Sequence, residues 1–149
     1  MRFTATYTQL ETSQPANFNF SNLGSQWNFN WLTYIIDDPS NPINACFKGQ
    51  EYEIQDEIYT FKDRYSRDKL RILASIELDK SRITKGENRA DHDYAVSWVQ
   101  NFGKGRVFYC SLGHRNETYF NPVIMQHYLA GLQFALGDLP ASADPSPKK

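Results

Sequence analysis

His114 is the residue of this sequence best suited to move a proton. It follows residues 106–112, a run of β-type side chains, and is separated from that run by Gly113 alone. An imidazole accepts or donates protons near neutral pH, and the end of a strand is where α/β proteins often present reactive groups. Glu117 follows three residues later and is placed to orient the ring or to act as a second acid or base. The alternative is a histidine hydrogen-bonded to loop backbone. We predict His114 and Glu117 as catalytic residues.

A second group of polar side chains lies on a segment that reads as extended. Neighbouring residues of a strand point to opposite faces, so Glu57 and Tyr59 share one face and Asp56 lies on the other. A carboxylate can bind sugar hydroxyls, and a tyrosine ring can stack on a sugar. The alternative is a structural carboxylate paired with Arg71 or Lys62, next to a packed aromatic ring. We predict Glu57 and Tyr59 as substrate-binding residues.

Three further polar residues, Asp91, His92 and Asp93, could bind a divalent metal together with His114. Adjacent residues alternate faces, so the three converge only if their loop curls. We favour a solvated turn, and we predict neither a metal nor a cofactor. His127 is expected on the exposed side of the last helix, without a role.

The two cysteines, Cys46 and Cys110, are expected to be small buried residues, because they form neither a disulfide framework nor a Cys-x-x-Cys pair. A nucleophilic role for Cys110 would need an oxyanion hole that the sequence does not supply. Trp98 is expected in the core.

The overall composition excludes several classes of partner. The chain has 149 residues, enough for one domain, and a net charge of -1 from 16 basic and 17 acidic residues. A nucleic-acid-binding protein would show a basic surplus, and so would one that binds an anionic membrane surface. The sequence has no apolar run of about 18 residues, which a membrane-spanning helix requires. Its start lacks the apolar region of a signal peptide, which favours the cytoplasm.

The apolar pattern predicts a sheet. A strand is expected near residues 3–8, and a helical turn over 43–47 after Asn41 and Pro42. The strongest strand has Leu70, Ile72, Ala74, Ile76 and Leu78 on one side. The other expected β-type runs are 31–36, 52–61, and the hairpin 94–101 with 106–112 around a Gly-containing turn.

The last element is predicted to be a helix that Asn121 caps, Pro122 opens and Gly137 ends. Its apolar residues recur at intervals of three and four, which is typical of a helix packed on a sheet. They are Ile124, Tyr128, Leu132 and Ala135, joined by Met125, Leu129 and Leu136.

An ordered set of motifs resembles the trehalose-utilisation (ThuA-like) domain family, which is similar in fold to class I glutamine amidotransferases. The motifs are Asp56-Glu57-Ile58-Tyr59, Leu70-Arg71-Ile72-Leu73, Ala95-Val96-Ser97-Trp98, Gly103-Lys104-Gly105-Arg106-Val107-Phe108-Tyr109, Leu112-Gly113-His114, and the helix that begins at Asn121-Pro122. The resemblance implies a partial flavodoxin-like, amidotransferase-like α/β sheet with an antiparallel hairpin and a C-terminal helix. By position, His114 resembles the histidine that follows a late strand in the amidotransferase-like fold.

The resemblance covers residues 31–139, which look like the C-terminal half of such a domain. Residues 1–30 look divergent or truncated and contain no nucleophile elbow, and residues 140–149 are expected to be a disordered tail. The implied function is carbohydrate metabolism on trehalose or a related disaccharide through a His-centred acid/base site. The alternatives are a non-catalytic carbohydrate-binding or interaction module and an inactive truncated domain. The expected partner is a small carbohydrate, and a homo-oligomer is left open.

Overall fold

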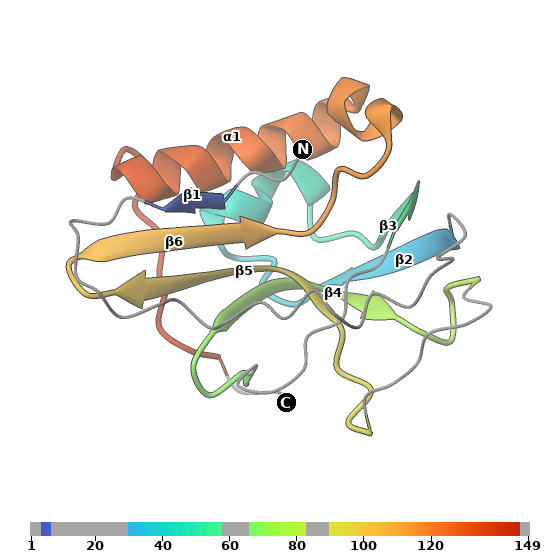
Figure 1. Ribbon diagram of the computed structural model, residues 1–149, viewed down its shortest axis with the longest axis horizontal. Coiled ribbons are helices and arrows are strands. Elements are labelled where there is room, and N and C mark those ends of the chain that lie inside the picture. The colour runs from blue at the N-terminus through green and yellow to red at the C-terminus, as the bar shows by residue number, and fades with distance from the viewer. Residues whose placement is uncertain (1–3, 7–29, 58–65, 83–89, 147–149) are drawn as a thin grey trace.

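The computed structural model describes residues 4–6, 30–57, 66–82 and 90–146, which form one six-stranded sheet covered by helices (Figure 1). The strands are β1 (Thr4–Thr6), β2 (Asn30–Ile36), β3 (Tyr52–Asp56), β4 (Arg71–Glu77), β5 (Ala95–Phe102) and β6 (Gly105–Cys110). The helices are the 3-10 helices η2 (Pro42–Phe47) and η3 (Asn116–Phe120) and the α-helix α1 (Pro122–Leu136).

The strand order is β1-β6-β5-β4-β2-β3, and each neighbouring pair is antiparallel. The predicted α/β fold with an antiparallel hairpin and a C-terminal helix is therefore confirmed. The hairpin of β5 and β6 closes between Phe102 and Gly105, and Gly103 has the positive φ of 57° that this short turn needs. The flavodoxin-like and amidotransferase-like parts of the fold assignment stay predictions.

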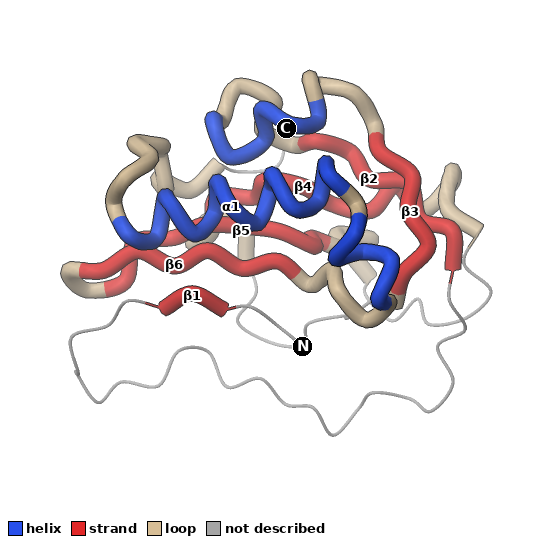
Figure 2. The backbone as a smooth tube through the Cα atoms, turned by 90° about the horizontal axis from the view of Figure 1, so that it is seen from above, coloured by secondary structure: helices blue, strands red, loops and turns tan. Residues whose placement is uncertain are grey.

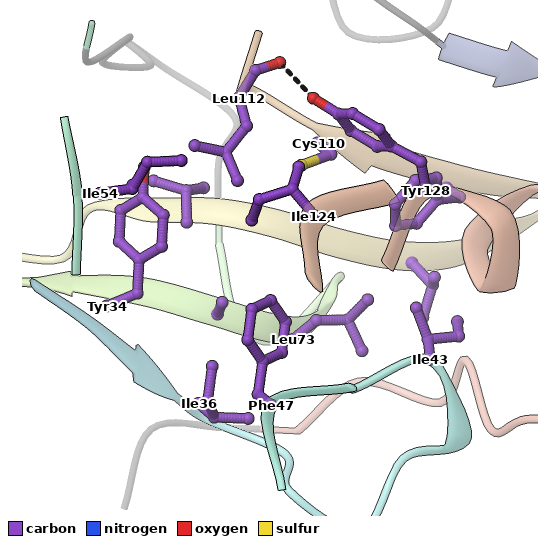
Figure 3. Close-up of a cluster of buried hydrophobic side chains, with 14 of the residues drawn as sticks. Tyr34, Ile36, Ile43, Phe47, Ile54, Leu73, Cys110, Leu112, Ile124 and Tyr128 are labelled. Carbon is purple, nitrogen blue, oxygen red and sulfur yellow. Dashed lines mark hydrogen bonds between the residues drawn. The ribbon is translucent and has the colours of Figure 1, made fainter. Parts of the chain in front are cut away.

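One face of the sheet carries the main core, because α1 and η2 lie over it (Figure 2). The apolar side chains of β2 that point to this face belong to one buried cluster with residues of both helices, and this cluster excludes water. Figure 3 shows part of this cluster. Its members include Leu32, Tyr34, Ile36, Ile43, Phe47, Ile54, Leu73, Val99, Phe108, Cys110, Ile124, Tyr128 and Phe134.

The opposite face carries a second, smaller cluster around the stacked rings of Trp98 and Tyr109, whose centroids are 3.9 Å apart. The remaining members of this cluster are Leu70, Ile72 and Ala95. Trp98 is buried, which confirms its predicted place in a core.

The prediction that alternate residues of β4 share one side is wrong. The register with β5 shifts between Ile72 and Ala74 and again between Ala74 and Ser75. Ile72 therefore belongs to the smaller cluster, whereas Ala74 and Ile76 belong to the main core. Such an irregularity reverses the faces of the residues that follow it, and the pattern of apolar residues alone does not reveal it.

Helix α1 begins and ends as predicted. The Asn121 side chain accepts hydrogen bonds from the backbone N–H groups of Val123 and Ile124, at 3.0 and 3.4 Å. Gly137 ends the helix with a φ of 99°, and its N–H bonds back to the carbonyl of Gln133.

The face that α1 buries differs from the predicted stripe. Ile124, Tyr128 and Ala135 are buried as expected, and His127, Gly131 and Phe134 join them. Gly131 allows α1 to approach Phe108 of β6 closely, since a Cβ at this position would lie 2.3 Å from the Phe108 ring. The other predicted members, Met125, Leu129, Leu132 and Leu136, are exposed.

Residues 140–146, which follow α1, contact the segment before η2 and the main core. Asn41 Nδ2 donates to the carbonyl of Ser142 at 3.3 Å, and Ala143 is buried in the main core. The domain boundaries and the tail over 140–149 stay predictions. No helix in the described ranges combines the length and the apolar content that crossing a membrane requires.

Candidate functional site

The segment that follows β6 meets the end of β3, and this contact brings together two residues singled out in the sequence. His114 Nδ1 lies 2.5 Å from Glu57 Oε2. The carboxylate is mostly covered, with 15% of its side chain exposed, whereas 46% of the His114 side chain is exposed. The imidazole is thus held on one side by a carboxylate and is accessible to a ligand on the other parts of its surface.

Gly113 allows the chain to turn before His114. Its φ is 114°, and a Cβ there would lie 2.5 Å from the Tyr119 hydroxyl oxygen. Tyr119 donates to the carbonyl of Gly113 at 3.0 Å, and Tyr128 donates to the carbonyl of Leu112 at 2.8 Å (Figure 3). Burial raises the pKa of both phenols, so they remain protonated donors. Side chains from η3 and α1 therefore fix the path of the backbone into His114.

Asp56 holds the same segment from the side of β3. Its carboxylate is buried and accepts hydrogen bonds from the backbone N–H groups of Gly113 (2.8 Å), His114 (3.2 Å) and Glu57 (2.9 Å). The Thr118 hydroxyl donates to it at 3.4 Å. A carboxylate is costly to bury unless such donors compensate for lost water. Asp56 thus joins the end of β3, directly before Glu57, to the backbone of His114.

Asp56 was not predicted as a site residue, although the sequence holds a signal for it. It stands on the face of β3 opposite Glu57 and two residues after the buried Ile54, at a position where the alternation calls for an apolar side chain. A carboxylate at an inward position must have partners, and these come from a loop far along the chain.

Glu117 is not the carboxylate that contacts the imidazole. Its oxygens accept hydrogen bonds from Arg115 at 3.0 and 3.2 Å, and 71% of its side chain is exposed. The guanidinium holds the pKa of Glu117 below its usual value through these bonds. Arg115 also donates to Gln55 Oε1, and so links η3 to β3. The catalytic assignment of Glu117 stays a prediction, and Tyr59 lies outside the described residues.

The cluster of Asp91, His92 and Asp93 has a structural explanation. Asp93 is buried and binds Arg67 through both oxygens, at 2.7 and 2.8 Å, and Arg67 also binds Asp37 at 2.7 Å. The expectation of a solvated turn is therefore wrong for Asp93, because its carboxylate is buried in an ion pair with the Arg67 guanidinium. Within the described parts of the chain, no three acidic, histidine or cysteine side chains gather as a metal site would need.

His127 is buried, so its expected position on the exposed side of α1 is wrong. Only 1% of it is exposed, and its ring lies between Phe47 and Phe108. Nε2 is 2.9 Å from the Ser97 hydroxyl, and Nδ1 is 3.1 Å from the carbonyl of Ile43. Burial lowers its pKa to about 4. A neutral His127 therefore joins α1 to β5 and η2, and it has no access to a substrate.

Cys110 is equally remote from chemistry. It is buried in the main core, and burial raises the pKa of its thiol to about 12. A thiol of this kind stays protonated at neutral pH and is a poor nucleophile. This agrees with the small buried residue predicted for Cys110.

The geometry near His114 supports proton transfer. A carboxylate that accepts from Nδ1–H holds the imidazole in one orientation and one tautomer and stabilises the charged ring when it gains a proton. Glu57 is placed for this role. Asp56, its neighbour in sequence, holds the backbone of His114 next to it.

Comparison with known proteins gives a family relationship. The model of the family ThuA, described as trehalose utilisation, matches residues 5–135. Neither a curated protein nor a solved structure matches the chain.

Proposed function

Because the chain belongs to the ThuA family of trehalose utilisation, we propose that it acts on a disaccharide such as trehalose through a His114–Glu57 acid/base pair. The observation that carries the proposal is the 2.5 Å contact between His114 Nδ1 and Glu57 Oε2, on an imidazole that solvent can reach. The proposal keeps the amidotransferase-like assignment, in which a histidine follows a late strand.

The proposed chemistry moves one proton at a time. Glu57 accepts the hydrogen bond from Nδ1–H, so that Nε2 removes a proton from a hydroxyl group of the sugar or from water. The oxygen that loses its proton attacks a glycosidic or hemiacetal carbon, and the imidazolium returns the proton to the leaving oxygen. Glu57 stabilises the imidazolium between these two steps, because their charges are opposite.

The division of roles between the two glutamates follows from their partners. Glu57 contacts the imidazole, whereas Glu117 contacts Arg115. We therefore place Glu57 as the residue that orients His114 and Glu117 as the residue that orients Arg115 beside the bound sugar.

The test is a turnover assay on the full chain with trehalose and related disaccharides as substrates. The measured quantity is the rate at which monosaccharide is released. His114→Ala is expected to lower kcat/KM by about 100-fold or more, the usual contribution of a general base. Glu57→Gln keeps the shape but loses the charge, and a decrease of about tenfold is expected. His92→Asn is the matched control, since it removes an exposed histidine at a left-handed backbone position that asparagine tolerates.

A non-catalytic carbohydrate-binding module is the second candidate, because the buried, protonated thiol of Cys110 is a poor nucleophile. Calorimetric titration with the same disaccharides separates the two. Binding without turnover, weakened by Glu57→Gln, supports the module. Turnover that His114→Ala leaves at the level of the unaltered chain overturns the acid/base proposal.

A further inference from the structure

Trp31 is a large aromatic residue that the fold leaves at the surface. Its neighbour in β2, Leu32, points to the main core, and alternation turns Trp31 to the opposite face. There 48% of Trp31 is exposed, whereas Thr33 on the same face is buried and its backbone N–H donates a hydrogen bond to the Ser81 hydroxyl oxygen. The exposed ring thus lies near the start of the strand, although the backbone carbonyl of Trp31 accepts a hydrogen bond from the N–H of Arg82 at 2.9 Å.

The strand register places Trp31 beside the groups of the candidate site. Trp31 pairs directly with Gln55 of β3, and residues opposite each other in an antiparallel pair point to the same face. Gln55 accepts a hydrogen bond from Arg115, the residue after His114. Glu57 follows Gln55 by two residues, which is about 7 Å along an extended chain. The indole therefore lies within one or two sugar rings of the His114–Glu57 pair.

The polar neighbours distinguish Trp31 from the other exposed apolar side chains. The exposed stripe of α1, which contains Leu129 and Leu136, belongs to a helix without a single charged residue. Trp31 instead has an amide, a guanidinium and a carboxylate close by, in Gln55, Arg115 and Glu57. Sites for small ligands combine an apolar or aromatic surface with a few placed polar groups.

We propose that Trp31 is the stacking platform of a pyranose subsite whose polar side is formed by Gln55 and Arg115, next to the His114–Glu57 pair. A pyranose ring has an apolar face of C–H groups and a rim of hydroxyl groups. The flat indole covers the apolar face, and the guanidinium and the amide meet the hydroxyls. The inference rests on the proposed function and adds the surface that binds the sugar unit not undergoing reaction.

The test is the affinity of the full chain for trehalose, measured by calorimetric titration for the unaltered protein, Trp31→Ala and Trp31→Phe. Trp31→Ala is expected to weaken binding about tenfold or more, because it removes the whole ring. Trp31→Phe keeps an aromatic surface and is expected to remain within about threefold. Leu129→Ala is the matched control, since it truncates an exposed apolar side chain far from these polar groups.

Kinetics separate this subsite from the acid/base pair. Trp31→Ala is expected to raise KM and leave kcat within about twofold, whereas His114→Ala lowers kcat. Ligand-induced change of tryptophan fluorescence gives a second readout. Among the three tryptophans, Trp98 is buried, Trp31→Phe should abolish most of the change, and Trp27→Phe should keep it. Circular dichroism checks that each variant is folded.

The outcomes distinguish the two proposals. If the unaltered chain binds trehalose and Trp31→Ala binds it equally well, the subsite is overturned and the acid/base proposal stands. If the unaltered chain binds none of the disaccharides, both are overturned. If Trp31→Ala changes the oligomeric state in sedimentation and leaves sugar affinity unchanged, the ring serves a protein contact and the subsite is likewise wrong.

Discussion

The edge of the sheet at His114 and the helix–sheet interface at His127 place the same residue type in opposite surroundings. His114 has a carboxylate partner and 46% of its side chain exposed, whereas His127 is enclosed by two aromatic rings and has only neutral partners. Desolvation without a compensating charge keeps the His127 ring neutral. The comparison shows that the surroundings, and not the residue type, separate a histidine that solvent can reach from a buried structural one.

The largest expected effect comes from Asp56, on the His114 side of the comparison. Asp56→Ala leaves several N–H groups without their acceptor, and each unpaired buried group is costly, so a loss of about 4 kcal/mol in unfolding free energy is expected. Urea unfolding measures it, with the exposed Asp138→Asn as the control. A loss no greater than that of the control would mean that Asp56 does not hold the segment.

The pH dependence of stability tests the His127 side. Its pKa is about 4 in the folded chain against an ordinary value of 6.5, so the unfolded chain binds more protons between these values. Stability from this residue is complete above pH 6.5, falls as the pH drops towards 4, and changes by about 3 kcal/mol in all. Unfolding free energy measured from pH 7 to 4 should vary less in His127→Gln than in the unaltered chain.

The exposed His92→Asn serves as the matched control for this pH series, because its side chain lies in solvent. Its curve should follow that of the unaltered chain. Equal slopes for His127→Gln and the unaltered chain would show that folding does not lower the pKa of His127, and the contrast with His114 would be lost.

A substitution at Gly131 tests whether close packing stabilises the interface between α1 and the sheet that encloses His127. Gly131→Ala places a Cβ 2.3 Å from the Phe108 ring, and overpacking of this kind is expected to cost about 2 kcal/mol. Thermal unfolding measures the loss, with Ala130→Gly used to allow for helix propensity at a neighbouring position. An unchanged Tm would indicate that α1 can shift away from β6 without penalty.

The smallest effect is expected for Glu117→Gln. Glu117 is exposed and pairs with Arg115, and exposed ion pairs of this kind contribute little to stability. The melting temperature should not change measurably, and kcat/KM should stay within about threefold. A decrease as large as that of Glu57→Gln would move the catalytic carboxylate from Glu57 to Glu117.

Local signals in the sequence predicted the elements well. Asn121, Pro122 and Gly137 set the limits of α1 through bonds and backbone angles that lie within a few residues. The hairpin of β5 and β6 follows in the same way from two β-type runs around Gly103. Side-chain alternation also placed Glu57 and Asp56 on opposite faces, and this separation is what gives them different partners.

Long-range contacts limited the prediction of the site. The pairing of Glu57 with His114, and the bond that Asp56 accepts from the backbone N–H of Gly113, join segments with three of the six strands between them in sequence. The register shift in β4 and the close approach of Gly131 to Phe108 depend on neighbouring strands. None of these contacts leaves a periodic pattern that a single segment would show.

The order of residues alone determined which segments become the strands and η2, where α1 starts and stops, and that an imidazole follows β6. Only the packed chain decided that this imidazole meets Glu57 at an open edge, while the one in α1 is sealed between aromatic rings. Capping and alternation act over a few residues, whereas solvent access and charge pairing depend on atoms that folding brings from distant parts of the chain.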